Sequence, residues 1–292
     1  MNDMVWRSPV MATDNYWASP EQVTFAQLCY TYLLISPSYD LARKFRQGLL
    51  TDAEKAILPA DIDVVLGVHD LLGDLKQVEF DDWWPNKGIA AFGCEGKEAI
   101  VFPIDAIWPS KPAMTEQLAD RMGQYLNGRF SEQDPMPCLI VSVPLTLTKS
   151  AATEQIKAFL DKTASKFDDA PRIKPIYELH GTKRDLKGLI RYMKCAMCRC
   201  EEPSAKLWEI GVLAELSTTY SERLAKGKGT LEDQQALKML ASRAIHRAVM
   251  IAENAARGKF PTYEPNKHAL KPDWMAMGDV FDGLEGWYYE EE

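Results

Sequence analysis

The stretch from residue 231 to residue 257 limits the possible folds of this chain more than any other stretch. Apolar side chains recur along it at helical spacing, at Leu237, Leu240, Ala241, Ala244, Ala248, Ile251, Ala252 and Ala255, and Gly258 follows. This period predicts a long amphipathic helix that buries one face and ends at the glycine. A helix of about seven turns needs packing partners along its length, so the C-terminal part should be mainly helical.

Four polar side chains lie beside this stripe, within about 80° on a helical wheel. They are Arg243, Arg247, Asn254 and Arg257. Such a row can neutralise phosphates along a nucleic acid, but it also resembles the solvated face of any helix. The local charge favours the first interpretation: residues 183–272 hold 17 Lys and Arg and 10 Asp and Glu, a balance of +7 in a chain of net charge −8.

Two shorter helices are predicted just before the long one. Apolar residues at Leu207, Ile210, Gly211 and Ala214 mark the first, a turn follows at residues 216–217, and a capping box of Thr219 with Glu222 begins the second, which ends at Gly227. This layout resembles a helix-turn-helix, and a generic helical hairpin explains it as well. Two positions depart from the motif, because Glu215 stands where a glycine is usual and Ser221 stands where an aliphatic residue is usual.

A helix-turn-helix would place the polar residues of its second helix against nucleic acid. We therefore add Thr218, Thr219, Arg223, Lys226 and Lys228 to the arginine row as candidate nucleic-acid contacts.

Three of the six cysteines fall close together at Cys195, Cys198 and Cys200. The apolar residues Leu186, Leu189, Ile190, Met193 and Met197 predict a helix there. On that helix Cys195 should lie opposite the apolar stripe, so the three thiols would not converge on one metal ion. A zinc site or a redox thiol beside Lys194 and Arg199 stays open as an alternative, but we predict no metal and no cofactor.

The first 85 residues also predict short helices. Ser19-Pro20 and Thr51 with Glu54 begin two of them, and a third begins at Ser36-Pro37 and ends at Gly48. Residues 36–52 and 217–233 share five identities at a constant offset, which indicates either a repeated unit or the chance likeness of two capped helices.

The middle of the chain differs. Short apolar runs within residues 88–107 predict a hairpin of strands, and residues 138–145, CLIVSVPL, predict a buried strand. Helices are expected over residues 114–130 and 149–167.

Two aromatic clusters are candidate partner-binding sites. Trp83 and Trp84 adjoin two aspartates, and Trp287, Tyr288 and Tyr289 lie in an acidic stretch, residues 273–292, that holds seven acids and no base. The alternatives are a packed core for the first and a solvated terminus for the second.

No motif for a nucleotide, a metalloprotease or a nucleophilic hydrolase occurs, and four scattered histidines suggest no catalytic pair. The longest apolar runs are far shorter than the roughly 20 residues of a membrane-spanning helix, and the first ten residues do not resemble a signal peptide. We therefore expect a cytoplasmic protein that is not an enzyme and does not contact a membrane.

Together these features predict an α+β, mainly helical protein. Its expected parts are a helical N-terminal part (residues 1–85), a small α+β unit (86–178), a basic helix-turn-helix-like domain (179–272) and an acidic aromatic tail (273–292). The predicted function is DNA binding by an accessory or regulatory protein through the C-terminal helical domain. The alternative is a protein-interaction or assembly component, with protein partners or a second copy of the chain in place of DNA.

Overall fold

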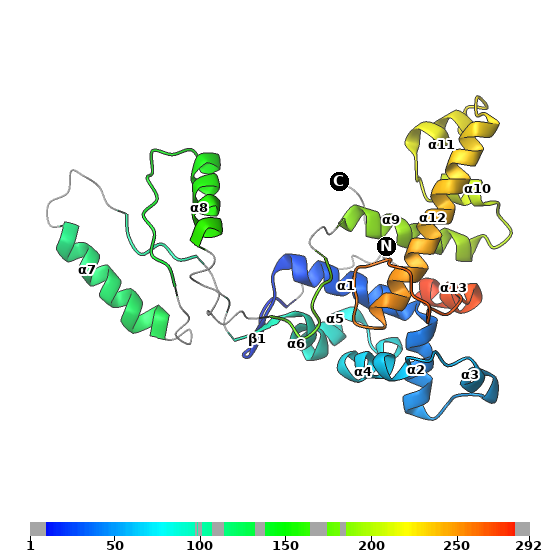
Figure 1. Ribbon diagram of the computed structural model, residues 1–292, viewed down its shortest axis with the longest axis horizontal. Helices are drawn as coiled ribbons and strands as arrows, with labels where there is room; N and C mark the ends of the chain where they lie inside the picture. Colours follow the sequence, from blue (N-terminus) through cyan, green and yellow to red (C-terminus); the bar gives the residue numbers. More distant parts are fainter. Residues whose placement is uncertain are drawn as a thin grey trace, which may run out of the picture. The chain divides into compact units, whose positions relative to one another are not determined.

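A computed structural model describes residues 10–96, 98, 101–106, 114–131, 138–163, 174–181 and 185–283 of the 292. The described chain is mainly helical, as predicted (Figure 1). Its α-helices are α1 (Pro20–Leu34), α2 (Pro37–Gln47), α3 (Asp52–Ala56), α4 (Ile62–Leu72), α5 (Phe80–Trp83), α6 (Ile89–Phe92), α7 (Met114–Tyr125), α8 (Lys149–Thr163), α9 (Leu186–Glu201), α10 (Leu207–Leu213), α11 (Thr218–Ala225), α12 (Leu231–Ala255) and α13 (Trp274–Gly283). Shorter elements are the 3-10 turn η1 (Leu75–Gln77), the π turns η2 (Trp84–Gly88) and η3 (Leu126–Phe130), and the strands β1 (Tyr16–Trp17) and β2 (Cys94–Glu95).

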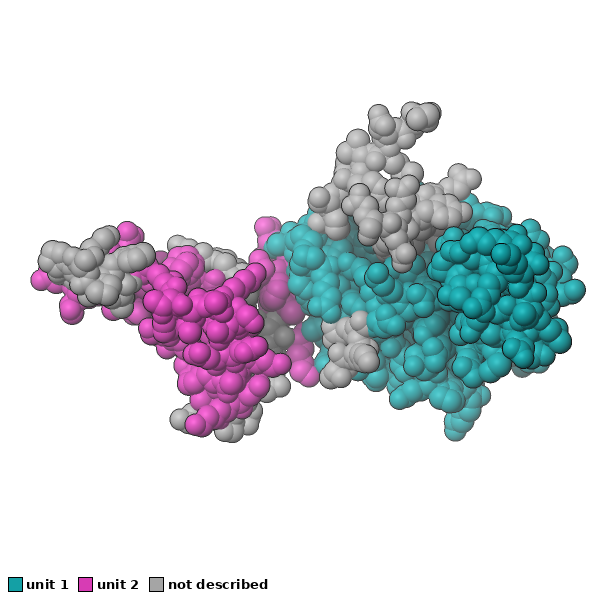
Figure 2. Space-filling model, turned by 90° about the horizontal axis from the view of Figure 1, so that it is seen from above, with its two compact units in different colours: residues 1–13, 18–93, 175–292 teal, residues 14–17, 94–174 magenta. Residues whose placement is uncertain are grey.

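The chain forms two compact units (Figure 2). The first consists of residues 1–13, 18–93 and 175–292, and the second of residues 14–17 and 94–174. The helical parts that we expected to be separate, before residue 86 and after residue 178, thus share one unit. Helix α12 packs against α1 and α2 as well as against α9 and α10, which joins the two ends of the chain in one core.

The N-terminal helices begin where the capping residues predict. The Ser19 hydroxyl accepts a hydrogen bond from Gln22 N, and Thr51 caps α3 in the same way through Glu54 N. Helix α2 begins after Ser36 and is closed by Gly48, whose φ of 70° a residue with a side chain adopts only under strain. Helix α1 is buried around most of its circumference, so its sequence is apolar on nearly all sides.

The predicted strand hairpin within residues 88–107 is wrong. Ile89, Ala91 and Phe92 form the short helix α6 and are buried, and residues 101–106 have no regular structure. Short apolar runs suit a buried strand and a buried helical turn equally well, and here packing against α1 decides for the helix. The only sheet among the described residues is the antiparallel pair β1–β2, with Tyr16 opposite Glu95. Residues 138–145 are neither buried nor paired as a strand.

The cysteine stretch lies on one continuous helix, α9, but all three thiols are buried. Cys195 was expected on the solvent-exposed side of the helix. It is fully buried instead, because α12 packs there and places the Ala241 carbonyl oxygen 3.8 Å from its sulfur. On the other side, the Tyr32 hydroxyl of α1 donates a 2.8 Å hydrogen bond to the Leu189 carbonyl of α9. Helix α9 is thus enclosed by two partners, which a helical wheel cannot reveal. Burial raises the pKa of Cys195 and Cys200 to about 12 and that of Cys198 to about 11, so these thiols stay protonated at neutral pH.

Helix α12 covers nearly all of the predicted range, and Thr230, which was not among the predicted caps, caps it by accepting from Asp233 N. Most of its apolar stripe is buried, but Leu240 is 37% exposed, contrary to expectation. Helix α10 approaches α12 so closely that a β-carbon on Gly211 would lie 3.1 Å from the Leu237 carbonyl oxygen. Only glycine allows this crossing without a shift of one helix.

The buried His69 of α4 generates a prediction about pH. Neither ring nitrogen has a hydrogen-bond partner among the described residues, and burial lowers the pKa of the imidazole. A histidine with a lowered folded-state pKa stabilises the fold above its unfolded pKa, near 6.5, and this contribution is lost as the pH falls through that value. The free energy of unfolding should therefore decrease between pH 7 and pH 5, and His69→Leu should remove most of the decrease. Urea unfolding at the two pH values tests this, and an equal decrease in the variant would contradict it.

Candidate nucleic-acid interface

Helices α10 and α11 meet at a four-residue turn, residues 214–217. Helix α10 begins where Glu209 accepts a 2.6 Å hydrogen bond from Lys206 N, and the turn closes when Leu216 N donates to the Gly211 carbonyl. The Ser217 hydroxyl then accepts from Tyr220 N at 3.5 Å and caps α11. The expected cap at Thr219 is therefore wrong by two residues. Because Ser217 takes that role, the hydroxyls of Thr218 and Thr219 are left on the exposed first turn of α11.

Glu215 is the only residue other than glycine with a positive φ among the described residues, at 52°. It is the position at which the sequence lacks the glycine typical of a helix-turn-helix turn. Its carboxylate lies 2.6 Å from the Lys194 ammonium of α9, and this hydrogen bond lowers the pKa of Glu215. The backbone of Glu215 therefore adopts a left-handed conformation although the residue carries a β-carbon.

This strained turn yields a prediction about stability. Glu215→Gly should raise the free energy of unfolding by about 1 kcal/mol, because a residue with a β-carbon is disfavoured in the left-handed region. Glu215→Ala is the matched control: it keeps the strain, loses the exposed ion pair, and should lower stability slightly. Urea denaturation of both variants separates the two effects. A glycine variant no more stable than the alanine variant would show that the turn stores no strain.

A surface hollow of about 260 Å³ opens on the exposed side of α11. Its lining residues come from the first turn of α11, from its second turn and from the segment after it: Thr218, Thr219, Glu222, Arg223, Lys226 and Lys228. Five of these six are candidates from the sequence, and the structure brings them together.

The charges in the hollow are partly paired. The Lys226 ammonium lies 2.8 Å from the Glu222 carboxylate, and Arg223 Nη1 lies 3.3 Å from Asp233, which accepts from Thr230 N in the capping box of α12. Hydrogen bonds from Thr230 lower the pKa of Asp233 and keep it ionised beside the arginine. Lys228 forms no ion pair with any other described residue. The lining thus holds three cationic side chains and one carboxylate, and one of the cations has no carboxylate partner.

The arginine row of α12 does not form one surface. Arg243 is exposed. The Arg247 guanidinium lies over the rings of Tyr192 and Tyr263, with its carbon 5.2 and 4.6 Å from the ring centres, and donates to the Tyr192 hydroxyl. Such cation–π contacts stabilise the packing of α12 against α9 and against the chain after α12 that contains Tyr263. Arg247 is therefore mainly engaged inside the protein.

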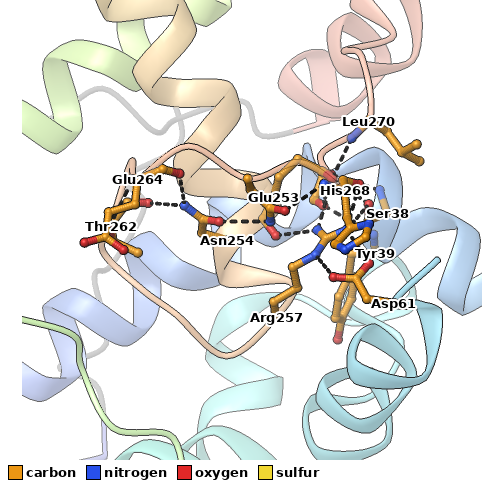
Figure 3. Close-up of polar contacts among 12 residues, drawn as sticks. Ser38, Tyr39, Asp61, Glu253, Asn254, Arg257, Thr262, Glu264, His268 and Leu270 are labelled. Atoms are coloured by element: carbon orange, nitrogen blue, oxygen red, sulfur yellow. Dashed lines mark hydrogen bonds and ion pairs between the residues drawn. The ribbon is translucent and has the colours of Figure 1, made fainter. Parts of the chain in front are cut away.

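Arg257 and Asn254, expected to face nucleic acid, are buried instead (Figure 3). Arg257 Nε and Nη2 donate to the two oxygens of Asp61 at 2.7 and 3.0 Å, and Nη1 donates to Glu253 Oε2 at 3.1 Å. Asn254 donates to the carbonyls of Thr262 and Glu264, both at 3.0 Å. Both side chains thus fix the chain that follows α12, and their polar groups are not available to a phosphate.

Glu253 is the residue of this network that sequence analysis missed. Its carboxylate is fully buried and accepts hydrogen bonds from the Ser36 hydroxyl, from the amide and hydroxyl of Ser38, and from Leu270 N. The clue in the sequence is an acid inside the alanine-rich end of the long helix, where charge requires a partner.

Two arginines of the predicted long helix, one buried and one exposed, should differ in how much they contribute to the free energy of unfolding. Arg257→Ala leaves Glu253 and Asp61 without their cation and should lower the free energy of unfolding by about 3–5 kcal/mol. Arg243→Ala, on the same helix but exposed, should change it by less than about 0.5 kcal/mol. Thermal and urea unfolding measure both. Similar stabilities for the two variants would mean that the buried network contributes nothing.

The other expected sites lie elsewhere. Trp83 and Trp84 are not exposed contact points, because both indoles are buried among Phe80 and Phe92 and donate to the carbonyls of Leu72 and Val10. The candidates Trp287, Tyr288 and Tyr289 lie outside the described residues. Within the described ranges, no three His, Cys, Asp or Glu side chains are grouped to hold a metal ion, and no helix is long and apolar enough to cross a membrane.

Comparison of this chain with protein-family models, with curated proteins and with solved structures finds no match. The hollow on α11 is the feature of the described chain on which a proposed function rests.

Proposed function

We propose that the protein binds DNA through the exposed face of α11 and acts as an accessory or regulatory factor without catalysing a reaction. The observation that carries this proposal is the hollow in which two threonine hydroxyls of the first helical turn lie beside three cationic side chains. Hydroxyls at the start of a second helix suit base edges or phosphates, and flanking lysines suit the phosphate backbone.

The arrangement of the helices supports the same proposal. A helix of seven residues, a four-residue turn with a left-handed residue and a helix of eight residues follow one another. This order resembles a helix-turn-helix, in which the second helix enters the major groove while the first crosses the backbone. Helix α11 has no buried residue, so its outer face is free for such contacts.

The contact surface is narrower than the sequence alone suggests. It consists of the hollow and the exposed Arg243, without Asn254 and Arg257 and with little part for Arg247. A small basic surface on a chain of net charge −8 implies weak binding that depends strongly on salt, because counterion release from phosphates supplies the affinity.

The decisive variant is Lys228→Ala, because Lys228 has no ion-pair partner in the described part of the chain whose loss would complicate the result. Binding to a short labelled DNA duplex, followed by fluorescence anisotropy at increasing salt, should weaken for every sequence. The slope of log affinity against log salt should flatten by about 0.9, since one fewer phosphate is neutralised.

Lys55→Ala is the control, because Lys55 lies on α3, far from α11 in the same unit (Figure 1), and its ion pair with Asp52 is exposed and contributes little to stability. It should leave both affinity and slope unchanged. The proposal fails if the parent protein does not bind DNA even at low salt, or if the two lysine variants behave alike.

A further inference from the structure

The segment 138–145, CLIVSVPL, is an apolar stretch of the second unit. It belongs to no helix or strand, and every one of its residues is exposed. Its large apolar side chains, Leu139, Ile140, Val141, Val143 and Leu145, are between 39% and 70% exposed. Three of its eight residues are β-branched, which suits a strand, and yet it has no neighbouring strand among the described residues.

The backbone of this segment is also unpaired. From residue 139 to residue 143 no N–H or C=O group forms a backbone hydrogen bond with another described residue. The first such bond after the segment joins Leu147 N to the Pro144 carbonyl in a turn. A row of free backbone groups flanked by apolar side chains is a template for another strand.

An exposed apolar helix follows directly. Helix α8 begins four residues after Leu145 and has no buried residue. Its apolar side chains Ile156, Phe159 and Leu160, at helical spacing, are 38–45% exposed. The second unit therefore presents two consecutive apolar elements without an internal partner among the described residues.

We propose that segment 138–145 pairs with the same segment of a second copy of this chain, antiparallel about a two-fold axis at Val141. This register places Leu139 opposite Val143 of the partner and Val141 opposite its own copy, so branched apolar side chains form every cross-strand pair on that face. Pro144, which has no N–H, limits the paired stretch at both ends.

Charge favours a second copy as the occupant. No charged residue occurs from residue 138 to residue 148, whereas the whole chain has a net charge of −8. Two identical chains repel one another least where they carry no charge. A basic or acidic partner would find no opposite charge here.

A dimer needs more surface than the strand pair alone. A two-stranded ribbon is only marginally stable, and a specific interface buries about 800 Å² per partner. The exposed apolar residues of α8 in each copy supply further surface for the same contact. This inference concerns the second unit and does not depend on DNA binding by α11.

The oligomeric state of the full chain, measured by sedimentation and by light scattering over a range of concentrations, should show a monomer–dimer equilibrium. Val141→Lys places two like charges opposite each other on the axis and should raise the dimer dissociation constant about tenfold or more. Val101→Lys is the matched control, because Val101 is a fully exposed valine of the same unit, and it should leave the equilibrium unchanged. Both positions are exposed, so unchanged circular dichroism should accompany each variant.

A cross-link fixes the register. In a Cys138→Ser background, which removes the only exposed native cysteine, Val141→Cys should form a disulfide between copies on mild oxidation, since paired residues on the axis lie within about 5.5 Å. Val101→Cys in the same background should not. A monomer at all concentrations, growth beyond the dimer, an unaffected Val141→Lys dimer, or equal cross-linking at both positions would each overturn the proposal.

Discussion

The buried Glu253 carboxylate is the interaction on which the arrangement of the first unit depends. It lies at the N-terminus of α2, where Ser38 N and two serine hydroxyls donate to it, and Arg257 supplies the opposite charge. A buried carboxylate is tolerated only when such donors are all in place. Helix α12 can therefore meet α2 in one orientation, and the Arg257–Asp61 pair extends the same constraint to the start of α4.

This anchoring divides α12 into two halves with different neighbours. Its C-terminal half is held by polar contacts to α2 and to the chain after residue 258, while its N-terminal half packs through small residues against α9 and α10. Ala241 and Ala244 allow α9 and α10 to approach, and Gly211 allows α10 to cross near Leu237. Helix α11 packs mainly against α12 and α10, so these two helices fix its position. Its outer face stays exposed.

Sequence patterns predicted most helix starts where a local interaction decides the structure. The capping residues Ser19, Ser36 and Thr51 act within three residues along the chain, so the sequence alone reveals them, although the cap of α11 was placed two residues too late. The patterns failed where a distant neighbour decides. A helical wheel places Arg257 beside the apolar stripe, but only Asp61, 196 residues away, makes that position buried. In the same way, the packing of α12 buries Cys195, which the helical wheel places on the solvent-exposed side of α9.

The arginines and lysines of the C-terminal half therefore differ in how easily each could leave its carboxylate partner and bind a phosphate. The Lys226–Glu222 pair is exposed on both sides, at 64% and 58%, and a pair of this kind contributes at most about 1 kcal/mol in water. A phosphate can replace Glu222 at little cost, because water already solvates both groups. Arg223 is 56% exposed, but its partner Asp233 is only 5% exposed and depends on the hydrogen bond from Thr230 N as well, so Arg223 is less free to change its partner than Lys226. Arg257 is only 5% exposed, and its carboxylate partners would be left buried and uncompensated if it turned outward. Exposure, and not the presence of an existing partner, thus decides which cations belong to the proposed interface.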